Sequence, residues 1–414
     1  MSASRDVASP AMMTGLFDGP VPSHVPPGLV RTFDYITDQS FVAEPYAGCT
    51  ALMADAPRIF YSPGFAGGWI ITRFEDVRAV LQDAETFSSK GIANVVPRED
   101  GQSFSLIPLE LDAPEHGKYR VMLNPIFAPR EIDRLEADIR RVSTNLIDAF
   151  VDKGSCDFVA DFARPLPTAI FVRMMGLPED RTAQFIKWTE QIIHSHNPQL
   201  QKEAADGVLG LLMSLFAERR RVPTDDLIGK LVRLEIDGKP ISDNDMCGFG
   251  FLLFIAGLDT VTSSLSNIFR YLAEMPELQS RLAKDPSLIP NAVEEFMRAF
   301  SSVNTGRVVA RDIEFQGVQM KAGDKVLCFM SAANRDAGEF EQPEQVDIER
   351  EASRHLAFSS GPHRCIGSHL ARREMRIALE LFLARIPQYS LVSLDQSPRY
   401  GGGVWGHYAL PLRW

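Results

Sequence analysis

The chain has 414 residues, of which 45% are hydrophobic and 23% are charged, as in an ordinary globular protein with a large core. Lysine and arginine total 43 against 54 aspartates and glutamates, so the net charge is −11. This balance argues against nucleic acid as a partner, because phosphate binding needs a basic surface. The five cysteines are scattered, odd in number and without a CxxC pair, which favours a reduced, cytoplasmic protein over a disulfide framework.

We expect neither a signal peptide nor a membrane span in the N-terminal segment. Residues 1–30 are predicted to form a flexible arm, because several prolines interrupt helix and strand alike. The longest apolar run, Met246–Leu258, is about half the ~20 residues that a bilayer crossing needs. We therefore expect no membrane attachment and one domain over residues 31–414.

Short elements follow the arm. Gly68–Thr72 is apolar and β-prone, and Phe74–Leu81 has the spacing of an amphipathic helix. Ser88–Gln102 has no clean period and is predicted to be a loop over a pocket.

His116 and Arg120 lie four residues apart, on one face of a helix that Asp112 is expected to start. Two such donors could hold carboxylates in an apolar pocket through charge-assisted hydrogen bonds. The alternative is a solvated basic helix face.

The pair His194 and His196 could suggest a metal, but an isolated HxH without a cysteine or carboxylate partner is more often on the surface.

A long helix is predicted from about residue 243 to 274, capped by Ser242. Its centre is apolar around the whole circumference, which places it inside the protein. Gly257, Asp259 and Thr260 interrupt this apolar centre together, so we expect the helix to be opened locally, as at many functional sites. The alternative is an Asp-Thr pair that caps a broken helix.

Glu295 and Arg298 have the i, i+3 spacing of an ion pair within one helix, a pattern that chance also produces often. Three short strands are predicted next, at Val308–Ala310, Ile313–Val318 and Lys325–Phe329.

The stretch Phe358-Ser-Ser-Gly-Pro-His-Arg-Cys-Ile-Gly367 places Cys365 just before an amphipathic helix. The positive end of a helix dipole and its free N–H groups stabilise a thiolate, so we expect a lowered pKa for Cys365. Gly361 and Gly367 suit a backbone that bends sharply beside a flat partner. A soft anionic sulfur beneath a planar group indicates haem iron held by thiolate. The alternative is a buried, inert cysteine.

These residues resemble the signatures of the cytochrome P-450 haem-thiolate monooxygenases, in the bacterial soluble form and closest to camphor hydroxylase-like members. Ser359 departs from the glycine usual at its position. The likeness covers roughly residues 65–414, and its motifs are the cysteine loop, an HxxxR element (His116, Arg120), an ExxR element (Glu295, Arg298) and the distal sequence Ala256-Gly-Leu-Asp-Thr260.

The resemblance implies a mainly α fold with a small β region, in which a single domain encloses haem b between a long distal helix and the proximal cysteine loop. It implies Cys365 as the axial iron ligand and Asp259 and Thr260 as the catalytic proton-delivering pair. The residues expected to contact the cofactor are His116, Arg120, Ala256, Gly257, Arg307, His363 and Cys365. Arg350 would join Glu295 and Arg298 in a structural cluster that fixes the cysteine loop.

Phe104 stands where camphor hydroxylases carry a substrate-binding tyrosine, so selectivity would come from shape. Leu252, Ile255, Val303 and Val404 would complete an apolar pocket. We expect it to take a small apolar molecule such as a terpenoid, a norisoprenoid or an aromatic compound.

The implied reaction inserts one atom of O2 into this substrate, with electrons from an external donor. A basic group near the cysteine in an acidic chain would steer an acidic partner, which we expect to be a [2Fe–2S] ferredoxin with its reductase. The basic group near the cysteine consists of His363, Arg364, Arg372, Arg373 and Arg376. The alternatives are a peroxide-driven haem-thiolate enzyme, which would normally lack the acid–alcohol pair, and a haem-based gas-binding protein.

Overall fold

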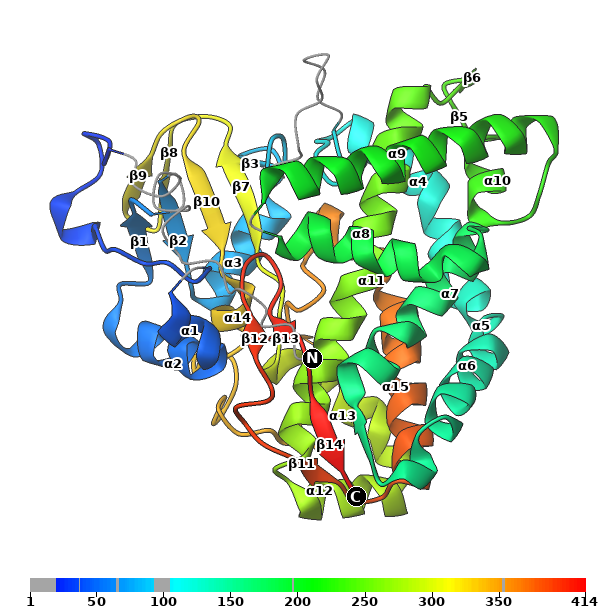
Figure 1. The fold of residues 1–414 in the computed structure, drawn as a ribbon. Helices are drawn as coiled ribbons and strands as arrows, with labels where there is room; N and C mark the ends of the chain where they lie inside the picture. The colour runs from blue at the N-terminus through cyan, green and yellow to red at the C-terminus, as the bar shows by residue number, and fades with distance from the viewer. Residues whose placement is uncertain (1–19, 37, 65–66, 93–104, 196, 352–353) are drawn as a thin grey trace.

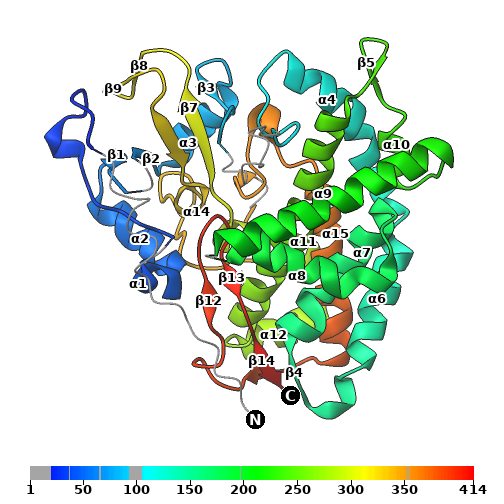
Figure 2. The same ribbon diagram turned by 45° about the horizontal axis from the view of Figure 1, so that its top comes forward.

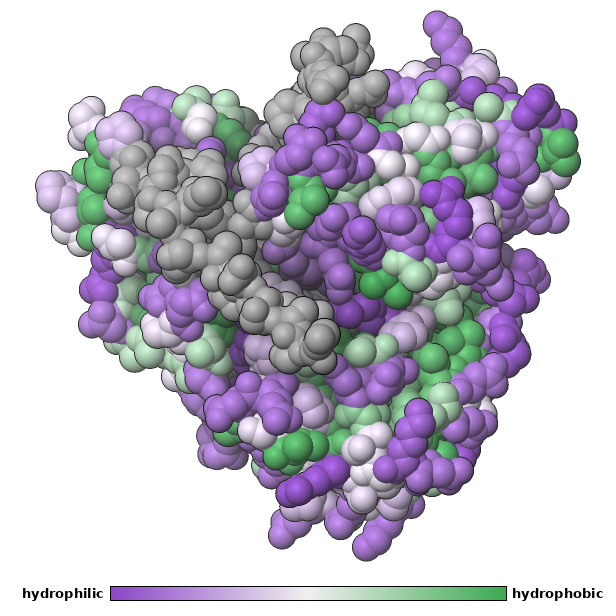
Figure 3. Space-filling view, in the orientation of Figure 1, coloured by the Kyte–Doolittle hydropathy of each residue, from purple (hydrophilic) through white to green (hydrophobic). Residues whose placement is uncertain are grey.

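The computed structural model describes residues 20–36, 38–64, 67–92, 105–195, 197–351 and 354–414. A large helical region and a smaller sheet region lie side by side, with the sheet on the left in Figure 1. The predicted mainly α fold with a small β region is confirmed. Hydrophilic residues cover most of the face shown in Figure 3, and apolar residues form only scattered patches there.

Helix α11, Asp243–Leu272, runs through the centre of the helical region. The Ser242 hydroxyl accepts a hydrogen bond from the backbone N–H of Asp245 (3.1 Å), as the predicted cap requires. Among the described residues, α11 alone is long and apolar enough to cross a membrane, and 72% of its most apolar window is buried inside the protein. It is the core helix that the apolar pattern predicts.

The expected local opening of this helix is wrong, because α11 is helical without interruption over its 30 residues. The Phe171 ring fills the place of a side chain at Gly257, where an added Cβ would lie 2.6 Å from it. The hydroxyls of Thr260 and Thr262 donate to carbonyls four residues earlier. These contacts accommodate the glycine and the polar residues without unwinding the helix.

The other long helices pack around α11 (Figure 2). Three cover one end, namely α7 Pro165–Met175, α8 Thr182–His194 and α9 Pro198–Arg221. Four lie toward the other end, namely α6 Glu136–Asp148, α12 Pro276–Lys284, α13 Ile289–Ala299 and α15 Ser368–Arg385. The shorter ones are α1 Gln39–Ala43, α2 Pro45–Asp55, α3 Phe74–Gln82, α4 Glu115–Leu123, α5 Pro129–Asp133, α10 Leu227–Leu231 and α14 Met330–Ala333.

The main sheet has the strand order β1-β2-β10-β7-β3. Its strands are β1 Ile59–Ser62, β2 Gly68–Ile71, β10 Lys325–Cys328, β7 Thr305–Val309 and β3 Phe87–Ser88. Only β2 and β10 run parallel. The smaller sheets contain β4 Ser155–Asp157, β5 Glu235–Ile236, β6 Lys239–Pro240, β8 Ile313–Phe315, β9 Val318–Met320, β11 Ser390–Leu391, β12 Arg399–Tyr400, β13 Gly406–His407 and β14 Pro411–Arg413.

Part of the predicted N-terminal arm lies against the sheet. Val25 is only 5% exposed and belongs to the apolar cluster of the sheet region. Val30 forms a parallel bridge with Tyr61 in β1. The division into an arm and one domain stays a prediction.

Candidate active site

The cysteine loop is built so that Cys365 faces the interior. A short 3-10 turn, Gly361–His363, precedes it, and α15 starts at Ser368. The Cys365 N–H donates to the Phe358 carbonyl (2.9 Å), which closes the loop. Gly361 has a φ of +70°, and a Cβ there would lie 2.5 Å from the Leu81 carbonyl oxygen. Cys365 is exposed, although nearby protein atoms partly desolvate its thiol.

The expected lowering of the Cys365 pKa is wrong for the thiol in this structure. Burial raises its pKa, and a hydrogen bond with the Gly367 backbone and the charges of Arg120, Arg372 and Arg364 oppose that shift without overcoming it. The helix start acts in the predicted direction, but desolvation of a charge outweighs it. A metal ion would reverse this balance, because a coordinating thiol loses its proton.

Ser359 shows why glycine suits this position. Its φ is +61°, a left-handed conformation that costs an L-residue roughly 1–2 kcal/mol. Its hydroxyl is also buried without a hydrogen-bond partner among the described residues.

Ser359→Gly is therefore expected to raise the unfolding free energy by about 1 kcal/mol, because the strain and the unsatisfied hydroxyl both disappear. Thermal unfolding of the holoprotein measures the change. Ser360→Gly is the matched control, since Ser360 has an extended backbone (φ −140°) and should lose stability. Equal melting temperatures for Ser359→Gly and wild type would contradict the strain.

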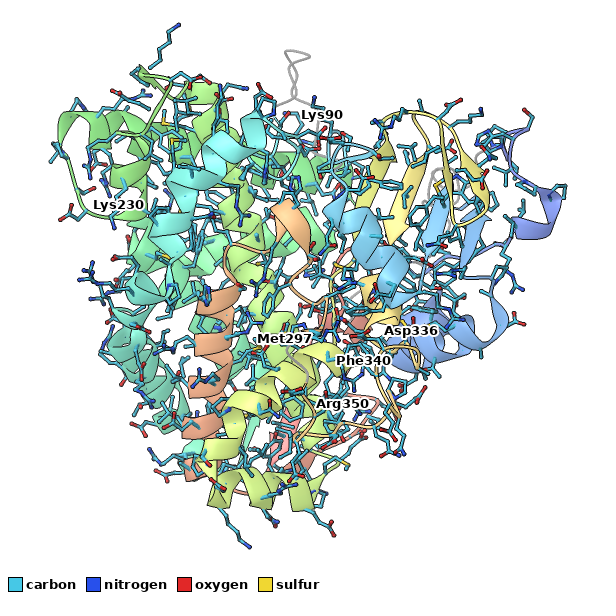
Figure 4. All side chains as sticks on the ribbon, turned by 180° about the vertical axis from the view of Figure 1, so that it is seen from behind. Lys90, Lys230, Met297, Asp336, Phe340 and Arg350 are labelled. Carbon is cyan, nitrogen blue, oxygen red and sulfur yellow. The ribbon has the colours of Figure 1, made fainter. Side chains whose placement is uncertain are left out.

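The ExxR pair on α13 is fully buried. The Arg298 guanidinium donates twice to the Glu295 carboxylate (both 2.8 Å), and Arg350 Nε donates to it at 3.3 Å. Arg298 also donates to the carbonyls of Asn334, Pro343 and Gln345. The expected three-residue cluster is present, and Figure 4 shows Arg350 and Phe340 beside α13, behind the face of Figure 1.

A group of basic side chains from three elements lies next to Cys365. The His116 ring from α4 packs on the His363 ring, with centroids 4.0 Å apart. Burial, followed by the charge of Arg120, lowers the pKa of His116 to about 4. Burial, followed by the charge of His116, lowers the pKa of His363 to about 3. The Nε2 atoms of both rings and Nε of Arg307 are buried without a hydrogen-bond partner among the described residues.

Buried donors without acceptors are costly, so this group is suited to a ligand that brings acceptors. Two carboxylates, such as the propionates of haem, match donors that are cationic or carry N–H. Arg120 already donates to the Arg364 carbonyl (2.9 Å), which ties α4 to the cysteine loop. Asp112 does not cap α4 as expected. It accepts from Ser88 Oγ (2.5 Å) and Ser89 N (2.8 Å), and α4 begins at Glu115.

One face of α11 is open in the middle of the core. Ala256 is exposed and Thr260 is half-buried, whereas Leu258, Asp259 and Val261 are buried. The Thr260 hydroxyl donates to the Ala256 carbonyl (2.9 Å). Gly257 instead faces Phe171 of α7. This strip of a core helix and the exposed Cys365 are therefore both accessible to a bound group.

Asp259 has a partner that the sequence did not suggest. His194 Nε2, at the end of α8, lies 2.9 Å from Asp259 Oδ1. His194 is therefore not the surface residue we expected, and His196 lies outside the described residues. A separation of 65 residues leaves no local spacing signal for such a pair.

The predicted pocket residues fall in two places. Leu252 and Ile255 are partly buried on α11 and pack against the apolar cluster formed with α7 and α9. Val303 and Val404 form an isolated antiparallel bridge with each other. Phe104 lies outside the described residues.

The basic surface near the cysteine is smaller than expected, because ion pairs neutralise part of it. Arg372 is held by Glu294 (2.6 and 2.8 Å), and Arg373 pairs with Glu136 and Asp133. His363 faces inward. In the described parts of the chain, only Arg364 and Arg376 of this group are exposed without an ion pair.

Comparisons with known proteins agree with this geometry. The family model described as Cytochrome P450 (P-450 hereafter) matches residues 179–387. The chain is 38% identical over 404 residues to the probable cytochrome P-450 127A1 of Sinorhizobium fredii, covering 95% of this chain and 97% of the relative. It is 32% identical over 354 residues to the mycinamicin IV hydroxylase/epoxidase of Micromonospora griseorubida, covering 84% and 89%.

The crystal structure of CYP101J2 superposes with a TM-score of 0.86 at 31% identity, covering 96% of this chain and 99% of that one. The Sinorhizobium fredii relative and the CYP101J2 structure cover nearly the whole chain, and the family model includes the cysteine loop and the central helix. The chain belongs to the cytochrome P-450 family of monooxygenases, whose cofactor is haem b with a cysteine thiolate as axial ligand.

Proposed function

We propose that this monooxygenase hydroxylates a small apolar molecule of terpenoid or norisoprenoid size, with electrons from a [2Fe–2S] ferredoxin and its reductase. The observation that carries the proposal is the apolar character of the side chains expected around the pocket. Leu252 and Ile255 stand on α11 near the exposed Ala256, and Val303 and Val404 are bridged to each other. Such a pocket selects by shape rather than by hydrogen bonds.

The cysteine loop and the basic group would hold the cofactor. Cys365 provides the thiolate, which favours O–O bond cleavage when haem is bound. His116, Arg120, Arg307 and His363 would provide donors for the two propionates. The orphaned nitrogen atoms of His116, Arg307 and His363 support this role. Ala256 and Gly257 lie on the α11 segment that would border the opposite face.

Asp259 and Thr260 would deliver protons to the reacting oxygen. A hydroxyl has one donor and two acceptor positions. While Thr260 donates to the Ala256 carbonyl, its oxygen is available to accept a hydrogen bond from the pocket. Asp259, one residue before it, carries the ionisable group that would supply the proton.

Arg364 and Arg376 support an acidic electron donor. Both are exposed, Arg364 next to Cys365 in the chain and Arg376 further along α15, in a chain whose net charge is −11. Opposite local charge speeds the encounter of two proteins and makes it sensitive to salt.

The four remaining cysteines are free and buried, which suits the reducing cytoplasm.

A ligand screen followed by turnover tests this function. Binding is read from the low-spin to high-spin shift of the Soret band, and the compounds range from small terpenoids to steroids. We expect small apolar compounds to give the shift and to yield hydroxylated product only with O2, NADH, ferredoxin and reductase. Shifts confined to large polar ligands, or equal product formation with hydrogen peroxide alone, would contradict the proposal.

A further inference from the structure

The His194–Asp259 pair joins the proposed proton-delivery residue to a second ionisable group. Both side chains are 9% exposed, and Nε2 and Oδ1 are 2.9 Å apart. Asp259 Oδ2 is buried and has no hydrogen-bond partner among the described residues. Oδ1 is thus held by the imidazole of His194, and Oδ2 is available to pass a proton to an acceptor.

His194 lies at a helix end and beside two aromatic rings. His194 is the last residue of α8, and the C-terminal end of a helix stabilises a cation. The Tyr400 ring lies 4.1 Å from its ring and the Tyr408 ring 6.1 Å, between centroids. Aromatic faces attract cations.

The other groups around the pair act as a small network. Ser263 Oγ lies 2.7 Å from the Tyr400 hydroxyl and donates to the Asp259 carbonyl. Burial, followed by the charge of Asp259, raises the pKa of both Tyr400 and Tyr408. Both phenols therefore stay neutral. Arg164, at the start of α7, and Glu190, one turn before His194, neutralise each other at 3.1 Å. An imidazole can both donate and accept a proton through its ring nitrogens, so His194 is the group of this network suited to proton transfer.

We propose that His194 is a positioning residue that aims the Asp259 carboxylate and restores its proton between turnovers. This role rests on the proposed function, because it assigns Asp259 to proton delivery. It rests on a histidine at the end of α8 that meets the acid on α11.

The proton transfers balance without any change of electrons. The imidazolium gives its Nε2 proton to the Asp259 carboxylate, which leaves a neutral imidazole and a carboxylic acid. The acid then releases a proton toward the Thr260 side of α11 and becomes a carboxylate again. The imidazole regains a proton from solvent, so each round carries one proton from solvent to the pocket.

His194→Gln separates aiming from proton transfer. The glutamine amide can donate to the carboxylate as imidazole does, but it cannot ionise. We expect substrate affinity to stay within about twofold, and turnover to fall about 10- to 100-fold, toward the lower range for acid–base groups. The limb of the pH–rate profile that comes from histidine ionisation should vanish.

A second histidine–aspartate pair provides the matched control. His24 Nε2 lies 2.8 Å from Asp324 Oδ2 in the sheet region. His24→Gln removes the same kind of pair away from α11, and turnover and pH profile should match wild type.

Histidine NMR of the reduced, CO-bound holoprotein gives a readout independent of turnover. The ring signal assigned to His194 by its loss in His194→Gln should titrate, and its midpoint should move to lower pH in Asp259→Asn. The reason is that a neutral amide no longer stabilises the imidazolium.

Wild-type turnover and pH profile in His194→Gln, or a His194 signal that ignores Asp259→Asn, would overturn this role and leave the proposed function standing. Failure of the proposed function looks different. In that case the wild-type protein itself makes no hydroxylated product with ferredoxin.

Discussion

Thr260→Ala is expected to keep consuming NADH while releasing most of the reducing power as hydrogen peroxide. The alanine lacks the Thr260 hydroxyl on the open strip of α11. No hydroxyl would then hold the oxygen derived from O2 in place for controlled protonation. Asp259→Asn should behave differently, because it keeps the size of the side chain and loses only the ionisable group. Its turnover should fall ~100-fold or more, while product per NADH stays fairly high. NADH, product and peroxide are quantified together.

Ser264→Ala is the control for these two variants. Ser264 lies one turn further along α11, and its hydroxyl donates to the Thr260 carbonyl (2.9 Å). Its loss should leave coupling unchanged. Product formation by Thr260→Ala as efficient as in wild type would show that the acid–alcohol pair is structural.

Glu295→Gln is expected to destabilise the protein by about 3–5 kcal/mol, because it leaves the buried Arg298 cation without its carboxylate. Both side chains are fully buried, so water cannot replace the lost interaction. The cysteine loop should loosen with this change, and haem should dissociate at a lower denaturant concentration. Urea unfolding followed by far-UV circular dichroism and by the Soret band measures both effects.

The chain contains a natural control with the same spacing. Glu75 and Arg78 form an i, i+3 pair at 2.6 Å on the surface of α3. Glu75→Gln should cost less than about 0.5 kcal/mol. Equal losses at the two sites would contradict the assigned role of burial.

The features that follow from local spacing were predictable from the sequence. The Glu295–Arg298 contact depends only on helical geometry, and the cap at Ser242 depends on four consecutive residues. The apolar centre of α11 predicted its burial, because a helix without a polar face must be covered. The cysteine loop was recognisable because glycines mark its bends.

The features that depend on distant residues were not predictable. The pairing of Asp259 with His194 joins two helices, and the continuity of α11 depends on Phe171 from a third. The pKa of Cys365 follows from desolvation by the surrounding protein rather than from its place before a helix. Tertiary packing decided each case.

The spectrum of the reduced protein with carbon monoxide tests the central claim most directly. Thiolate ligation by Cys365 predicts a Soret band near about 450 nm, and Cys365→His should move it to the position typical of imidazole ligation. Cys328→Ser is the control, because Cys328 is fully buried in β10 and should leave the band unchanged. A band that stays in place in Cys365→His would contradict the assignment of Cys365 as the ligand.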